Sequence, residues 1–168
     1  MTPLKIIELE GDWNADTTKR TRVSCRGLVL REGKLLLSYE ANTGLWMIPG
    51  GGLEEGETDL ECCVREVGEE TGFLVRPIEC VLEIREAFWE FRSASRYFTA
   101  EVIGHSEAKR TEREAKAGMG PRWITLEEAL EAFSSECTDC PYPERLWRGL
   151  YRREYAALKA WQEMRSAP

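Results

Sequence analysis

The stretch GGLEEGETDLECCVREVGEETGF, from Gly51 to Phe73, constrains the fold more than any other part of the chain. It opens with glycines, which favour a tight turn. Thr58 and Glu61 then have the spacing of a capping box, in which each side chain satisfies a backbone amide of the other residue at a helix start. Gly72 stands where a helix end favours a left-handed residue. The stretch therefore predicts a turn and then a helix that begins at Thr58 and ends near Gly72.

Three glutamates share one side of this predicted helix. Each helical residue advances by about 100°, so Glu66, Glu69 and Glu70 project along one narrow arc. Two carboxylates about 4 Å apart repel by roughly 4 kcal/mol at the effective dielectric of a protein surface. A hard cation such as Mg²⁺, which prefers oxygen ligands, would reverse that sign. At this spacing alone an exposed acidic face is the simpler interpretation, so the metal hypothesis depends on the surrounding residues.

Those surroundings resemble the Nudix box, G-x5-E-x7-R-E-U-x-E-E-x-G-U, where U is a bulky apolar residue. Every defined position is filled, by Gly51, Glu57, Arg65, Glu66, Val67, Glu69, Glu70, Gly72 and Phe73. The resemblance continues upstream in LWMIPGG (45–51) and downstream in RWITLEEAL (122–130), and it covers most of residues 22–133. It implies the Nudix fold, an α/β (α+β) sandwich with a mixed β-sheet between helices.

The resemblance also implies roles for individual residues. A catalytic Mg²⁺ or Mn²⁺ would be held by the carboxylates of Glu66, Glu69 and Glu70. The backbone carbonyl of Gly50 would be a further ligand. The residues with structural roles would be Glu57, Arg65, Gly51 and Gly72. A planar guanidinium can grip a carboxylate through two hydrogen bonds, which suits the Glu57–Arg65 pair of the family.

A further catalytic glutamate is expected outside the box. The segment from Ser106 to Gly120 is highly charged and ends in glycines, so it is predicted to be a surface loop or a loose helix. In many proteins of the resembled family a glutamate from this region acts as a base or as an extra metal ligand. Glu112 and Glu114 are the two candidates, and the sequence does not choose between them.

Candidates for substrate contact lie on the predicted strands. Arg26 and Arg96 are candidates for phosphate binding, and Phe88 is a candidate for stacking on a base. The competing interpretation is that the arginines are ordinary surface charges and that the aromatic residue belongs to the core.

The activity implied by the resemblance is cleavage of a phosphoanhydride bond in a nucleoside diphosphate linked to a group X, by metal-activated water. A (deoxy)nucleoside triphosphate pyrophosphohydrolase is the first hypothesis, and ADP-ribose or a nucleotide sugar is the alternative substrate. A non-catalytic nucleotide-sensing domain is the alternative of another class. Such domains usually show a decayed box, whereas the box is intact here.

Composition limits the partners. The 168 residues suit one domain spanning 1–168. The net charge of -7 argues against general nucleic-acid binding. No apolar run is long enough to span a bilayer, and the N-terminus lacks the apolar core of a signal peptide, so a cytoplasmic location and no membrane partner are expected. A homodimer is kept open, because the aromatic residues near the C-terminus could form a dimer surface.

The remaining elements follow from periodicity. Strands are predicted over 4–10, 22–30, 34–39, 45–48, 78–91, 96–103 and 122–124, with a turn at 92–95. Helices are predicted from Thr125 to about Ser134 and over about 144–164. The second of these helices would bury one side, formed by Leu146, Leu150, Ala157, Leu158 and Trp161.

Six cysteines are expected to be reduced thiols rather than disulfides. Cys137 and Cys140 form a lone CxxC, which supplies half of a zinc site and does not favour zinc. Because adjacent helical residues point in different directions, Cys63 is expected to face inward and Cys62 to lie near the acidic face.

Overall fold

The computed structural model describes residues 2–15, 19–88 and 91–168, and the side chain of Phe88 lies outside the described part. The strands are β1 (Lys5–Glu10), β2 (Arg20–Arg31), β3 (Lys34–Glu40), β4 (Leu45–Met47), β5 (Gly50–Gly52), β6 (Phe73–Phe88), β7 (Phe91–His105) and β8 (Met119–Thr125). The helices are α1 (Asp59–Thr71), α2 (Glu112–Ala117), α3 (Leu126–Ser134) and α4 (Glu144–Ser166).

The strands form one mixed sheet. In the described residues the order is β1-β6-β7-β2-β3-β4, with β5 paired to β2 and β8 paired to β3. The β1–β6 and β2–β7 pairs are parallel, and the other pairs are antiparallel. The predicted fold class, a mixed sheet between helices, is therefore confirmed.

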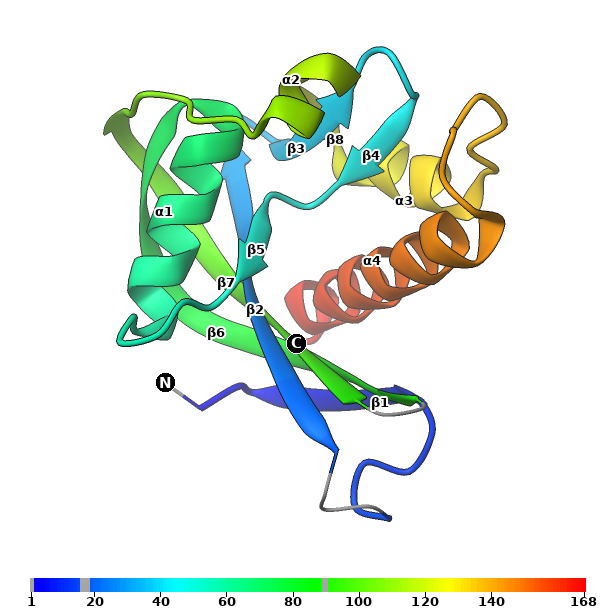
Figure 1. The fold of residues 1–168 in the computed structure, drawn as a ribbon. Helices are drawn as coiled ribbons and strands as arrows, with labels where there is room; N and C mark the ends of the chain where they lie inside the picture. The colour runs from blue at the N-terminus through cyan, green and yellow to red at the C-terminus, as the bar shows by residue number, and fades with distance from the viewer. Residues whose placement is uncertain (1, 16–18, 89–90) are drawn as a thin grey trace.

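Each face of the sheet carries its own hydrophobic core. Successive strand residues point to opposite faces, so Cys25 and Val29 of β2 pack with α1 while Leu28 packs with α3 and α4. Figure 1 shows α1 along one side of the sheet and α4 on the other. In this layered arrangement the charged side of α1 faces away from the hydrophobic core between α1 and the sheet, and it lies next to β5.

Local sequence explains where the helices begin and end. Thr58 and Glu61 form the predicted capping box of α1, and Gly72 ends the helix in a left-handed conformation with φ 78°. The same device opens α3, where Thr125 and Glu128 cap each other. It also opens α2 at Thr111, inside the segment predicted as a loop or loose helix.

Several strand boundaries differ from the prediction, and β6, for example, begins at Phe73 rather than at residue 78. The predicted turn at residues 92–95 is wrong, because these residues belong to β7, where Arg92 pairs with Ala87 of β6 and Thr21 of β2. Pairing on both sides keeps this polar segment extended. The last strand also begins earlier than predicted, at Met119, because β8 pairs with β3 from Glu40 onward.

Helix α4 buries a different set of residues from the predicted one. Ala157, Leu158 and Trp161 are buried as predicted, but Leu146 is 57% exposed. The buried side instead contains Trp147 and Tyr151, which pack on the chain's own core. These aromatic side chains are therefore not available for the dimer surface considered from the sequence.

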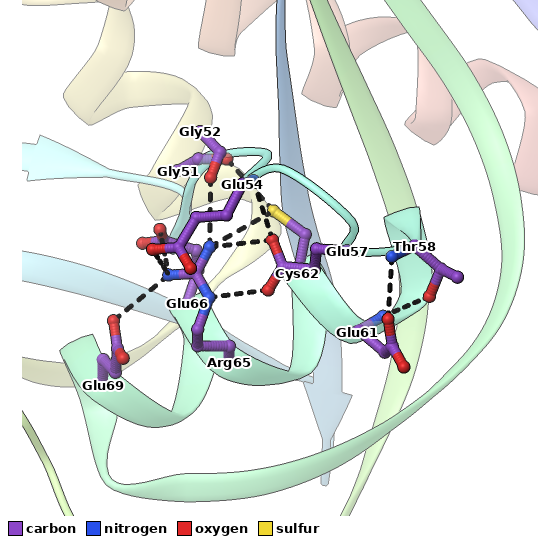
Figure 2. A network of polar contacts seen from close by, with 10 residues as sticks. All are labelled: Gly51, Gly52, Glu54, Glu57, Thr58, Glu61, Cys62, Arg65, Glu66 and Glu69. Atoms are coloured by element: carbon purple, nitrogen blue, oxygen red, sulfur yellow. Dashed lines mark hydrogen bonds and ion pairs between the residues drawn. The ribbon is translucent and has the colours of Figure 1, made fainter.

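The two adjacent cysteines of α1 are both fully buried. Cys62 still lies near the acidic face, as expected, because Nη2 of Arg65 is 3.9 Å from its thiol (Figure 2). Cys63 faces the sheet. Cys62 is covered by β5, because its thiol donates to the carbonyl of Gly51 over 3.5 Å. The glycine strand thus shields a second side of the helix.

The segment that leads into β5 is held by buried polar groups from distant parts of the chain. The carboxylate of Glu154 in α4 accepts hydrogen bonds from the Ile48 amide (2.8 Å) and the Tyr97 hydroxyl (2.6 Å). The guanidinium of Arg26 in β2 donates to the Ile48 carbonyl (3.0 Å). Arg153 donates to Glu154 over 3.0 Å. Burial disfavours a charged Glu154, but the charges of Arg153 and Arg26 outweigh it and lower the pKa of the Glu154 carboxyl.

None of the helices in the described ranges combines the length with the apolar composition that a membrane span needs.

Replacing Glu154 with Ala should destabilise the protein by about 3–5 kcal/mol, because it leaves the buried charge of Arg153 without its partner. Chemical denaturation would measure this loss as a change in the free energy of unfolding. Glu163→Ala, an exposed position on the same helix, is the control. Equal effects of the two substitutions would contradict a structural role for the Glu154 network.

Candidate active site

The candidate site lies where the acidic side of α1 meets β5. Gly50–Gly52 runs antiparallel to β2, with Gly50 opposite Arg26 and Gly51 opposite Cys25. A Cβ atom on Gly50 would lie 2.3 Å from the carbonyl oxygen of Cys25, closer than real Cβ contacts allow. Glycine is therefore required for β5 to lie this close to β2.

Arg65 is the centre of the charge network shown in Figure 2. It binds Glu57 through two hydrogen bonds, Nε to Oε1 (2.7 Å) and Nη2 to Oε2 (3.0 Å). Its Nη1 donates to Glu66 (2.7 Å) and Glu69 (3.3 Å), and its Nη2 donates to the Gly52 carbonyl (3.1 Å). One guanidinium thus connects the loop before α1, the strand β5 and two of the three helix carboxylates.

These contacts shift the pKa values of the paired groups. The hydrogen bonds from Arg65 lower the pKa of Glu57 from 4.5 to about 2. The pKa of Arg65 is raised, chiefly by its hydrogen bond to Glu57. The pair is therefore charged at neutral pH.

Glu66 packs directly against β5. A Cβ atom on Gly51 would lie 2.4 Å from the carboxyl carbon of Glu66, so only glycine leaves room for this carboxylate. Burial raises the pKa of Glu66, although the hydrogen bond from Arg65 opposes that shift. Gly51 thus forms a cradle for a charged group that is partly removed from water.

Glu70 points into the protein rather than toward Arg65. It is 5% exposed, and its Oε2 accepts hydrogen bonds from the Ser38 hydroxyl (2.9 Å) and the Gly50 amide (3.2 Å). Burial raises the pKa of Glu70 to about 8, while the nearby charge of Arg26 acts in the opposite direction. Arg110 donates to the backbone carbonyl of Glu70 (3.0 Å), which ties the segment before α2 to the end of α1.

The chemistry of this donor set fits a hard divalent cation. Its side-chain donors are carboxylate oxygens, which Mg²⁺ and Mn²⁺ prefer. The raised pKa values of Glu66 and Glu70 mark carboxylates whose charge a cation would stabilise. Among the described residues no three acidic, histidine or cysteine side chains converge tightly enough to hold a metal. The reason is that Arg65 draws Glu66 and Glu69 toward itself while Ser38 and Gly50 hold Glu70.

The two candidate glutamates outside the box lie at the start of α2. Glu114 serves as the capping residue for Thr111, and Glu112 is exposed and lies 3.5 Å from Lys116. In the described residues neither carboxylate contacts those of α1.

The two arginines predicted to bind substrate, Arg26 and Arg96, both already contact groups of the protein. Arg26 is buried and braces Ile48. Arg96 joins Glu83 (2.8 Å) to Asp59 (2.7 Å), so its charge is already paired. The side chain of Phe88 lies outside the described residues.

Two residues that were not predicted as part of the site, Ser38 and Arg110, fix Glu70 from two sides. Ser38 follows the buried run Leu35–Leu37, and a small polar residue that continues a buried strand needs a hydrogen-bond partner. That signal was available in the sequence. Arg110 lies in a charged segment and carries no comparable signal.

A cavity of about 660 Å³ opens at the Gly52 end of β5. It is lined by Arg20, Thr21, Arg22 and Val23 from the start of β2, by Gly52 and Leu53, and by Phe91. The described lining carries two positive charges and no carboxylate, in contrast to the acidic side of α1.

Replacing Glu57 with Gln should remove a pH-dependent part of the stability. Because the folded pKa of Glu57 is lowered from 4.5 to about 2, its contribution is complete above pH 4.5 and disappears as the pH falls toward 2. Denaturant unfolding from neutral to acidic pH should show the wild-type advantage over Glu57→Gln shrinking across that window. Glu55→Gln, at an exposed neighbouring position, is the control. A constant difference between wild type and Glu57→Gln would contradict the ion pair.

Replacing Gly51 with Ala should cost about 1–3 kcal/mol of stability, because the new methyl group would displace the Glu66 carboxylate. Unfolding in the presence of a chelator measures this cost without any metal contribution. The matched control is Gly104→Ala, where the added Cβ atom would meet Leu74 at an ordinary 3.8 Å. If both variants were equally stable, Glu66 would not be packed against β5.

Several known proteins resemble this chain in sequence and in fold. A family model described as the NUDIX domain matches residues 18–139. A MutT-like protein from Streptomyces ambofaciens is 34% identical over 110 residues, which are 65% of this chain and 67% of that protein. An asymmetrical bis(5'-nucleosyl)-tetraphosphatase from Sus scrofa is 32% identical over 101 residues, which are 56% of this chain and 67% of that protein. Two further relatives are matched over only 36% and 44% of their own lengths.

The fold comparison agrees with the sequence comparison. A solved NUDIX hydrolase from Nitrosomonas europaea is 21% identical and has a TM-score of 0.56, over 82% of this chain and 90% of that one. The matched family model contains both the box and the strands that support it. The chain belongs to the Nudix hydrolase family.

Proposed function

We propose that this protein hydrolyses a phosphoanhydride bond in a nucleoside diphosphate linked to a group X, and that a (deoxy)nucleoside triphosphate is its substrate. The observation that carries the proposal is the packing of the acidic side of α1 against β5, with Glu66 cradled by Gly51. An exposed acidic face would need no such cradle. The description of the Sus scrofa relative names a nucleotide polyphosphate as that protein's substrate, which supports the same substrate class.

Glu66, Glu69 and Glu70 would hold Mg²⁺ or Mn²⁺, together with the backbone carbonyl of Gly50. A bound cation would neutralise phosphate charge and activate the attacking water. Water adds its oxygen to phosphorus, the bridging P–O bond breaks, and a nucleoside monophosphate and pyrophosphate leave, with one proton passing to the surroundings. The chain's own contribution is to orient the carboxylates and to hold β5 in place.

Arg65 and Ser38 would act as positioning residues. Arg65 orients Glu66 and Glu69 through the same guanidinium that binds Glu57. Ser38 and the Gly50 amide orient Glu70. The helix carboxylates would have to turn only their terminal groups to converge, because their backbone is fixed by caps at both ends of α1.

The structure favours Glu112 over Glu114 as the assisting glutamate. Glu114 is committed to the capping box of α2, whereas the side chain of Glu112 is 87% exposed. Removal of Glu114 would unravel the start of a short helix, so its loss would affect structure before chemistry.

ADP-ribose or a nucleotide sugar is the alternative substrate, and a nucleotide-sensing domain without catalysis is the alternative function. A cytoplasmic location and a homodimer stay predictions. A dimer would have to use a surface other than the buried aromatic side of α4.

Glu69→Gln and Glu70→Gln should each lower kcat by about 10²-fold or more, because each removes a charge that holds the cation. Phosphate release from a panel of triphosphates, nucleotide sugars and ADP-ribose, in Mg²⁺ and in excess chelator, measures the effect. Glu127→Gln, an exposed glutamate of α3, is the control. Activity retained in either site variant, or in chelator, would refute the metal assignment. A silent wild-type protein that still binds a nucleotide would favour the sensing function.

A further inference from the structure

The cavity beside β5 has the size and placement of a ligand subsite. Its volume of about 660 Å³ lies within the range of about 300–1,000 Å³ that is typical of small-molecule pockets. Gly52 lines it, and the Gly52 carbonyl accepts a hydrogen bond from Arg65 over 3.1 Å. One peptide unit therefore separates the cavity from the network that holds Glu66 and Glu69.

Two arginines carry the charge of the described lining of the cavity. Arg20 and Arg22 alternate along β2 and therefore share one side of the strand. Within residues 2–15, 19–88 and 91–168 neither guanidinium forms an ion pair or a hydrogen bond, although the chain carries a net charge of -7. Arg65 and Arg96, by contrast, are bound by carboxylates. Two unpaired cations in one cavity repel each other, and an anion between them would reverse that repulsion.

The spacing matches a chain of phosphates that extends from the candidate site. Gly52 leaves room for Arg22, whose Nη2 would lie 3.7 Å from a Cβ atom placed on Gly52. At the other end of β5, Gly50 donates to Glu70. These two ends are two residues apart, which is about 7 Å along a strand. The carboxylates and Arg22 therefore lie at opposite ends of one short strand, which a bound chain of phosphates would follow.

We infer that Arg20 and Arg22 form a subsite for the terminal phosphates of the substrate. The substrate class is then a mononucleotide in which X itself carries phosphate, such as a nucleoside triphosphate. In ADP-ribose X is an uncharged sugar and gives the two arginines nothing to bind. This inference rests on the proposed function for its hydrolytic step, but the binding of a phosphate chain can be tested separately.

The binding test titrates inorganic pyrophosphate into the protein by calorimetry, with Mg²⁺ and in excess chelator. Arg20→Gln and Arg22→Gln should each weaken binding by about 10-fold, because each removes a charge-assisted hydrogen bond. Arg22→Lys should retain part of the affinity. Arg76→Gln removes the same charge from an exposed site on β6 and should change nothing. Equal affinities of wild type and the double variant, equal losses in Arg76→Gln, or no binding by wild type in either condition would overturn the subsite.

The kinetic test compares kcat/KM for a triphosphate with kcat/KM for ADP-ribose. The double variant should lose about 10²-fold on the triphosphate, the product of the two single losses, and nothing on ADP-ribose. Equal losses on both substrates would overturn the assignment. If no nucleotide were hydrolysed but pyrophosphate binding still depended on Arg20 and Arg22, the proposed function would fail and the phosphate subsite would stand.

Discussion

The guanidinium of Arg65 is the contact on which the candidate site depends. It binds Glu57 in the loop, Glu66 and Glu69 on the helix, and the carbonyl of Gly52 on β5. Without a central cation these carboxylates would repel one another by several kcal/mol at typical surface dielectrics. A single planar donor therefore holds together a strand, a loop and a helix. It also holds Glu66 and Glu69 at one guanidinium, while Ser38 and the Gly50 amide hold Glu70.

The remaining architecture fixes β5 against this helix. Ile48 is held at its amide by Glu154 and at its carbonyl by Arg26, so α4 and β2 together set where the glycines begin. Buried charges of this kind are costly unless paired and hydrogen-bonded. Glu154 meets that condition through Arg153 and Tyr97. Helix α4, on one face of the sheet, thus helps to set the position of β5, which packs against α1 on the other face.

Charge is separated along β5. Its Gly50 end lies beside Glu70, whose pKa is raised to about 8 chiefly by burial. Its Gly52 end lies beside the cavity with Arg20 and Arg22. A polyphosphate with bound cation has the complementary pattern, because its charge is neutralised by metal at one position and remains exposed at the next. Under the proposed function, the two ends of one short strand would bind two parts of one ligand.

Features that arise from local interactions could be predicted from the sequence. The capping box at Thr58, the left-handed Gly72 and the shared arc of Glu66, Glu69 and Glu70 all depend on residues within about one helical turn of each other, so spacing predicts them. The contacts of each side chain, by contrast, depend on the tertiary structure. Strand pairing placed Ser38 at Glu70, extended residues 92–95, covered Cys62 with β5, and paired Arg96 with Asp59. The same pairing left Arg20 and Arg22 together in a cavity. These outcomes depend on register between segments far apart in the chain, where a shift of one residue turns a side chain to the opposite face.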